Sequence, residues 1–269
     1  MKISNIMSRR NRILLRELVV TDFKLRYQGS VLGYAWSILK PLFLFAILYI
    51  VFEKFLRLGR DIENFPGYLL LGIVLWTFFA EATNLGLQSI ISRGDLIRKI
   101  NFPKYIIVIS GTVSSLINLA FNLAVVFVFI IFSGVDLSWH AVLIVPLIIE
   151  LYIFSLALAF FLAALNVKLR DVGYLWEIFM QAAFYATPVL YPLQMVYAQW
   201  PEAAKLLMLN PVAQVIQDAR YVLVTEDTLT IWTLFDDWKR FIPFIIIGIT
   251  LIMAVIYFKK NQNKFAEQL

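Results

Sequence analysis

Six apolar stretches of membrane-spanning length run through this 269-residue sequence and restrict what it can fold into. A helix needs about 20 mostly apolar residues to cross the hydrocarbon core, where it must satisfy its own backbone hydrogen bonds. The composition agrees, because 61% of the residues are hydrophobic and 16% are charged, whereas about a quarter of a soluble domain is charged. The sequence therefore predicts an all-α integral membrane protein. The six expected spans cover residues 34–52, 68–91, 105–132, 141–165, 172–190 and 241–258.

The basic residues predict the orientation of these spans. With a cytoplasmic N-terminus, 17 of the 24 lysines and arginines fall on the inner side, as the positive-inside rule favours. Six spans then place both termini in the cytoplasm. The net charge of +6 therefore indicates topology and contact with anionic lipid headgroups, not binding to nucleic acid. The basic residues assigned to the outer side are Lys54, Arg57, Arg60, Lys205, Arg220, Lys239 and Arg240.

The N-terminal arm is basic and amphipathic. On a helix over residues 8–27, Leu14 and Leu18 share one side and Lys24 lies opposite, although Asp22 interrupts the apolar side. This pattern favours a helix in the inner membrane interface, with a solvated basic tail as the alternative. The first 30 residues hold no continuous apolar core, so they do not resemble a cleavable signal peptide.

Three connectors between the spans carry further signals. The inner loop 92–104 mixes charge with apolar residues, which indicates a short docking helix. A second, tight inner loop ends at Asp171, which is placed to cap the following helix. The long outer region 191–240 is rich in aromatic residues, and Asn210–Pro211 is expected to open a helix there.

No residue pattern for catalysis stands out. None of the eleven glycines is followed by Lys, so the chain contains no phosphate-binding P-loop, and it contains no cysteine. Three acids lie inside expected spans, Glu81, Glu150 and Glu177, with His140 in an outer loop. An acid in a membrane span usually faces a partner or a cavity. We therefore favour interhelical hydrogen bonding or a polar cavity wall for Glu81, with ion coupling as the alternative.

Together the motifs resemble those of the membrane subunit of ABC-2 type polysaccharide exporters, a family that moves O-antigen, capsule, teichoic acid and rhamnan-type polymers. The matching segments follow one another in order over nearly the whole chain. They are Phe23–Tyr27, Ser30–Gly33, Trp36, Lys40–Pro41, Arg93–Pro103, Asn166–Asp171, Ala186–Pro192 and Asn210–Pro211.

This resemblance implies a fold and an activity. It implies a homodimer of six-helix subunits with the type V exporter architecture, above a cytoplasmic ABC ATPase dimer that binds ATP and Mg²⁺. This chain would then be a transport subunit without catalysis, cofactor or metal. The implied substrate is a polyprenyl-diphosphate-linked glycan, moved outward across the plasma (inner) membrane of a bacterium. The implied parts are a gate helix and entrance loop (1–33), the transmembrane domain (34–258, with outer re-entrant or gate helices over 191–240) and a cytoplasmic tail (259–269).

The resemblance also assigns residues to roles. The expected headgroup entrance is formed by Arg26, Tyr27, Leu32, Gly33, Trp36 and Lys40. The expected ATPase-coupling residues are Arg93, Gly94, Asp95, Leu96, Arg98, Lys99, Phe102 and Pro103, with Arg170 and Asp171 in the second inner loop. The intramembrane polar residues and the aromatics toward the outer face give the candidate channel lining: Glu81, Asn84, Tyr185, Tyr191 and Trp200.

Other functions remain as alternatives at this point. An ABC-2 permease for a small lipid, drug or peptide would share the topology. An ion-coupled secondary transporter is disfavoured, because the spans show neither repeat halves nor paired broken segments. A membrane scaffold that transports nothing would not need an amphipathic docking loop.

Overall fold

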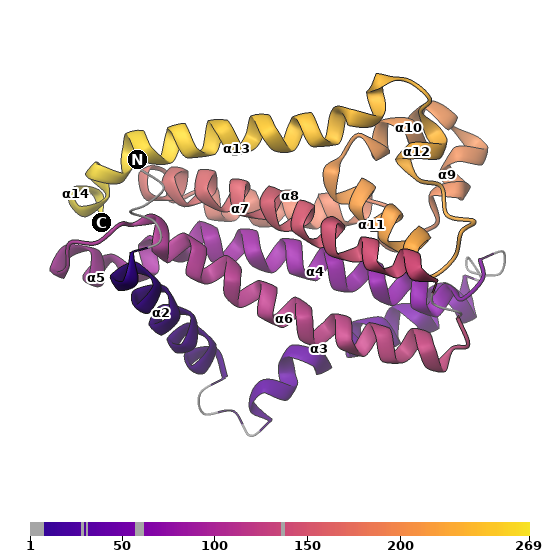
Figure 1. The fold of residues 1–269 in the computed structure, drawn as a ribbon, viewed down its shortest axis with the longest axis horizontal. Helices are drawn as coiled ribbons and strands as arrows, with labels where there is room; N and C mark the ends of the chain where they lie inside the picture. The colour runs from indigo at the N-terminus through magenta and orange to yellow at the C-terminus, as the bar shows by residue number, and fades with distance from the viewer. Residues whose placement is uncertain (1–7, 28–29, 31, 57–61, 136–137) are drawn as a thin grey trace.

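The structure is a computed structural model that describes residues 8–27, 30, 32–56, 62–135 and 138–269. Within these residues the chain forms helices and no β-strand (Figure 1). Lys2, Arg57, Arg60 and parts of the expected entrance loop lie outside the described residues. The longer helices are α2 (Arg9–Tyr27), α3 (Trp36–Tyr49), α4 (Phe65–Ser89), α6 (Tyr105–Phe132), α7 (Ile144–Lys168), α8 (Val172–Ala186), α11 (Pro211–Leu223) and α13 (Ile242–Asn261). The shorter ones are η1 (Gly33–Ala35), η2 (Ile50–Phe55), η3 (Ile91–Arg93), α5 (Gly94–Lys99), η4 (Trp139–Leu143), α9 (Leu193–Gln199), α10 (Pro201–Met208), α12 (Ile231–Leu234), η5 (Trp238–Phe241), η6 (Gln262–Lys264) and α14 (Phe265–Gln268).

Four helical segments in the described part of the chain are long and apolar enough to cross a membrane. They are Phe65–Ser89, Tyr105–Phe132, Trp139–Lys168 and Trp238–Gln268, and they overlap four of the six expected spans. The other two expected spans coincide with α3, which continues directly into η2, and with α8. At 15 residues, α8 is about 22 Å long, which is shorter than the roughly 30 Å hydrocarbon core.

The short helices gather at the two ends of this bundle. Helices α2, α5 and α14 lie at one end, together with the C-terminus, and we call it the α5 end (Figure 1). Helices α9 to α12 lie at the opposite end, which we call the α11 end (Figure 1). The residues on the α5 end are those that the sequence places in the cytoplasm.

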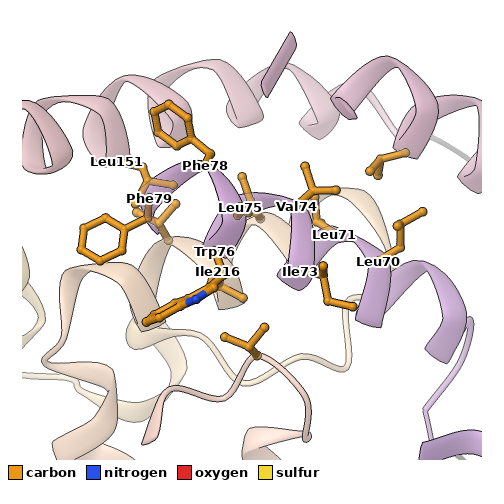
Figure 2. Close-up of a cluster of buried hydrophobic side chains, with 14 of the residues drawn as sticks. Leu70, Leu71, Ile73, Val74, Leu75, Trp76, Phe78, Phe79, Leu151 and Ile216 are labelled. Atoms are coloured by element: carbon orange, nitrogen blue, oxygen red, sulfur yellow. The ribbon is translucent and has the colours of Figure 1, made fainter. Parts of the chain in front are cut away.

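Helix α4 is the central element of the bundle. Every residue from Gly67 to Trp76 is buried, and Figure 2 shows side chains of this stretch packed near Leu151 of α7 and Ile216 of α11. A helix that is apolar around its whole circumference must be covered on all sides. Helices α3, α6, α7, α8 and α11 all contact α4 and supply this cover.

Glycine allows α4 and α7 to cross at short range. A methyl group added at Gly86 would lie 2.2 Å from the Cβ atom of Ala159 and 2.7 Å from its Cα atom. Small residues at such crossings bring two backbones together and increase dispersion contacts, which is how helices associate in lipid. This crossing fixes the position of α4 toward the α5 end.

The buried side chain of Arg220 fixes α4 toward the α11 end. Arg220 belongs to α11, and its guanidinium donates to the backbone oxygens of Tyr68 (3.0 Å), Pro188 (2.6 Å) and Val189 (2.6 Å). Its Cζ atom lies 3.6 Å from the centroid of the Tyr68 ring, a cation–π contact. Gly72 leaves room for it, since a methyl group there would lie 2.3 Å from Arg220 Nη2. Arg220 is therefore not a solvated loop charge, because α11 packs its polar side against the core, although it stays at the α11 end.

Two expected helix starts have different outcomes. The Asn210 side chain accepts a hydrogen bond from the Val212 amide at 3.0 Å, with Pro211 at the first helical position, so this expected start is confirmed. Asp171 occupies the N-cap position of α8, but its side chain accepts no capping hydrogen bond, and its φ of −69° and ψ of −15° are helical. A capping side chain works from extended backbone, so the expected cap is wrong.

We predict that Gly86→Ala destabilises the protein, because the added methyl group would force α4 and α7 apart. Overpacking of this kind costs about 1–3 kcal/mol. The matched control is Gly248→Ala in α13, where no atom lies within 4 Å of the added methyl group. The control should instead gain about 0.5–1 kcal/mol from helix propensity. Thermal unfolding in detergent measures both, and equal shifts in the two variants would contradict the close crossing.

Candidate functional site

A cavity of about 620 Å³ lies between α3, α4 and α6, in the half of the bundle nearer to the α5 end. Its walls are unusually polar for the interior of an apolar bundle. The polar and aromatic lining residues are Trp36, Ser37, Lys40, Thr77, Glu81, Asn84, Gln88, Asn118 and Asn122.

A second cavity of about 410 Å³ adjoins the first and extends to α8. The two cavities share Thr77, Ala80 and Asn84 of α4, so they form one depression along this helix. We call it the α4 groove; α3 borders it on one side and α8 on the other. Helix α8 contributes Trp176, Glu177, Met180, Gln181, Phe184 and Tyr185 to it.

Hydrogen bonds between helices hold the polar wall of the α4 groove. Asn118 Nδ2 donates to Glu81 Oε1 at 2.8 Å, which links α6 to α4. One turn later, Asn122 Nδ2 donates to the backbone oxygen of Ser37 at 3.1 Å, which links α6 to α3. A carboxyl group at membrane depth is costly unless it has partners, and Asn118 supplies one. Glu81 is therefore part of a fixed polar surface, as the sequence favours.

Aromatic rings line the groove from α8, beside Glu177 and Gln181, and Trp36 of α3 shares the first cavity with Glu81. The rings of Trp176 and Phe179 stack with centroids 5.2 Å apart, and Phe184 packs edge to face against Tyr185 at 5.3 Å. Trp36 is 43% exposed and Tyr185 is 69% exposed. Amide and carboxyl groups facing aromatic rings can bind a polyhydroxylated ring, because hydroxyl groups take the hydrogen bonds and the apolar ring faces take the aromatic contact.

The structure brings several expected site residues together. Trp36 and Lys40 of the expected entrance share a cavity with Glu81 and Asn84 of the expected channel lining, and Tyr185 lines the adjoining cavity. Leu32 is 48% exposed and lies outside the groove, as does Gly33. The side chains of Arg26 and Tyr27 lie outside what the structure describes.

Two expected channel residues lie away from the groove, toward the α11 end. Tyr191 donates from its hydroxyl to the backbone oxygen of Ala186 at 3.2 Å, and burial raises the pKa of this hydroxyl above its usual value. Trp200 is 71% exposed at the start of α10. Neither residue lines either cavity of the groove.

Sequence reasoning missed the two amides that face Glu81 from α6. Asn118 and Asn122 are four residues apart and are the two amide side chains of α6, whose other polar residues are small hydroxyls and the Tyr105 phenol. That spacing puts both side chains on one helical face, which is the signal that could have identified them. Gln88 and Gln181 also lie in the groove.

The expected coupling segment forms a short helix at the α5 end. Helix α5 buries Gly94 and Ile97 and leaves Asp95, Arg98 and Lys99 exposed. Asp95 accepts a hydrogen bond from Arg98 at 3.0 Å on that exposed side. Of the other expected coupling residues, Leu96 and Pro103 are half-buried, Phe102 is buried, and Arg93 turns inward toward α2. Arg170 and Asp171 are exposed in the second loop at this end.

Near the α11 end, α11 carries a buried acid, Asp218. It accepts a hydrogen bond from Gln214 Nε2 at 2.7 Å and is 6% exposed. Burial raises the pKa of Asp218 to about 6, although hydrogen bonds from Gln214, Ile231 and Trp232 oppose this shift. The carboxyl group borders a cavity of about 470 Å³ together with His140 and Trp232.

The chain is similar to known transport proteins over most of its length. A family described as ABC-2 type transporter matches residues 13–224. The O-antigen export system permease protein RfbA of Myxococcus xanthus is 30% identical over 261 residues, which cover 96% of each chain. A protein of the same name from Klebsiella pneumoniae is 30% identical over 258 residues, which cover 95% of each chain.

We predict that Asp218→Asn changes how stability depends on pH. The folded-state pKa of about 6 lies above the ordinary value of 3.8, so Asp218 favours the folded state below pH 4 and loses this effect as the pH rises to 6. The variant should therefore gain stability relative to the wild type between pH 4 and pH 6, by roughly 3 kcal/mol at most. Thermal unfolding in detergent across this range measures the difference, and parallel curves would contradict the raised pKa.

Proposed function

This chain belongs to the ABC-2 type transporter family, and we propose that it is the permease of an ATP-driven exporter for a polysaccharide linked to polyprenyl diphosphate. Two relatives that match it almost end to end are named O-antigen export permeases. The observation that carries the proposal is the α4 groove, which combines amides and carboxyl groups with aromatic rings from α3 and α8. A sugar polymer fits this chemistry better than an apolar drug or lipid, which would displace water from the exposed amides of Asn84 and Gln88 without giving them a hydrogen-bond partner.

The groove is open along one side, and we propose that a second copy of the chain closes it into a channel. Of α8, Val172 alone is buried, while Tyr174, Ile178 and Phe179 are 73%, 65% and 56% exposed. On α3, Phe43 and Ile47 are 58% and 62% exposed. In a homodimer, part of these apolar faces would be covered by the partner and the rest by lipid. Helices α3 and α8 would then complete the six membrane segments of each subunit.

We place the headgroup entrance where α2 leads into α3. Lys40 lines the groove on the side nearer to the α5 end, and the connection from α2 reaches α3 through Gly33. A diphosphate would gain charge-assisted hydrogen bonds from Lys40 and from Arg26 at the end of α2. The sugar chain would then extend from this point along the α4 groove.

The exposed face of α5 is the proposed contact for an ABC ATPase dimer in the cytoplasm. Asp95, Arg98 and Lys99 offer charges of both signs there, and Ile100 adds an apolar surface that is 49% exposed. The ATPase would bind ATP and Mg²⁺, and this chain would contribute neither catalysis nor a cofactor. Both termini would then be cytoplasmic, and the α11 end would face the outside.

We predict that Asn84→Leu reduces polymer export about tenfold, because it removes an exposed amide from the middle of the groove. Cells that make the lipid-linked glycan and carry the cognate ATPase would be tested with labelled sugar, and surface polymer would be compared with polymer retained inside. Ser133→Leu, at an exposed position at the end of α6, is the matched control. A polar-to-leucine change that affects export equally at both positions would contradict a role for the groove. Transport by the purified chain on an ion gradient without ATPase would overturn the proposed function.

We predict that Gly33→Leu lowers export while Gly33→Asn retains most of it. Gly33 has a φ of +47°, in the left-handed region, and no atom lies within 4 Å of an added Cβ. Space is therefore not limiting, and the conformation costs about 1–2 kcal/mol for most residues but less for Asn. The same surface-polymer measurement distinguishes the cost of the backbone conformation from the effect of side-chain size. Equal loss in both variants would mean that side-chain size, not backbone conformation, matters at the entrance.

A further inference from the structure

The coupling segment is joined to the N-terminal helix by an ion pair. Arg93, one residue before α5, pairs through Nη2 with the carboxylate of Asp22 in α2, 71 residues earlier in the chain. Ser110 Oγ of α6 donates to the other carboxylate oxygen at 3.3 Å. The two charged side chains are only 18% and 26% exposed. An ion pair shielded in this way is screened less by salt than a surface pair, so it can fix the distance between two elements.

An apolar cluster lies beneath this ion pair. Leu18 of α2, Ile97 of α5 and Phe102 belong to the same buried cluster, which extends into α6, α7 and α13. Helix α2 lies along α6, and Figure 1 shows it at the α5 end of the bundle. The amphipathic face of α2 is therefore covered by the protein along Leu14, Leu15 and Leu18.

The C-terminal helix α14 contacts the coupling segment on another side. Phe265 is fully buried and packs edge to face against Phe258, with centroids 5.4 Å apart. This places Leu269 over Gly94, where a methyl group added to the glycine would lie 3.6 Å from Leu269 Cβ. Helix α2 is thus ion-paired to Arg93, directly before α5. Leu269, directly after α14, packs against Gly94, the first residue of α5.

We propose that Asp22 and α14 form a two-point clamp on the beginning of the coupling segment: α14 holds one side of it, and the Asp22–Arg93 ion pair makes the segment and the N-terminal helix move together. This inference rests on the proposed function, in which α5 meets the ATPase. Arg93 would not contact the ATPase directly; it acts as a positioning residue that transmits displacement of α5 to α2. Arg26 lies one helical turn beyond Asp22, about 6 Å along the axis. A movement of α5 therefore reaches the proposed headgroup entrance through α2, without passing through the groove.

The test of the ion pair compares Asp22→Arg, Arg93→Asp and the double variant that exchanges the two charges, all in complex with the ATPase. Each single variant should lower polymer exported per ATP hydrolysed about tenfold, and the exchange should restore it to within about threefold of the wild type. The control is the same exchange at Glu202 and Lys205, an exposed ion pair in α10. Phe265→Ala should lower coupling as well, whereas Glu267→Ala, exposed on the same helix, should not.

A distance measurement separates the clamp from the proposed function. Because the chain has no natural cysteine, spin labels can be placed at Arg16→Cys on α2 and Asn101→Cys after α5, both exposed. The distance distribution should stay narrow with and without trapped nucleotide in the wild type, broaden in the Asp22→Arg variant, and narrow again in the charge exchange. Single variants with unchanged distance and coupling, or an exchange that restores neither, would overturn the clamp. A normal distance pattern in a chain that exports no glycan would instead overturn the proposed function alone.

Discussion

The close packing of α4 against its neighbours is the constraint on which the rest of the structure depends. Toward the α5 end, Gly86 meets Ala159 without room for another methyl group, and toward the α11 end Gly72 leaves space for the guanidinium of Arg220. That guanidinium gives three backbone oxygens a donor where water is excluded, since Arg220 is fully buried. Removing it would leave those oxygens unpaired, so α11 and the turn after α8 keep their places against α4 through one side chain.

With α4 fixed at both ends, its remaining face becomes the groove. Apolar neighbours cover most of the helix, but the face with Thr77, Glu81 and Asn84 points to the cavities beside α3 and α8. Asn118 binds Glu81 from a third helix, so the polar wall is built from elements whose spacing the packing has already fixed. A binding surface on rigid helices holds its geometry better than one on loops. This is why the proposed translocation path follows the groove and not the aromatic residues of the α11 end.

Much of the helical framework could be predicted from the sequence, because length, apolar character and capping residues act locally. The spans expected at 68–91, 105–132, 141–165 and 241–258 all overlap apolar helices of the structure, and Asn210–Pro211 does open α11. Contacts between distant segments could not be predicted in this way. The burial of Arg220 could not be predicted because its three acceptors are 31 to 152 residues away in the chain. Of the groove, Glu81 and Asn84 were expected from their cost in lipid, while Asn118 and Asn122 give only a shared helical face in the sequence, and their partners Glu81 and Ser37 follow from the packing of α6 against α4 and α3.

Asp22 shows how one apparent defect in a sequence pattern can carry information about architecture. A carboxylate within the apolar arc of α2 would weaken a helix whose only task was to lie in the membrane interface. Its partners Arg93 and Ser110 come from η3 and α6, so the carboxylate binds the helix to the bundle instead. The leucines of α2 are covered by the same cluster that lies under α5. The N-terminal helix is therefore bound to protein at its middle, through Leu18 and Asp22.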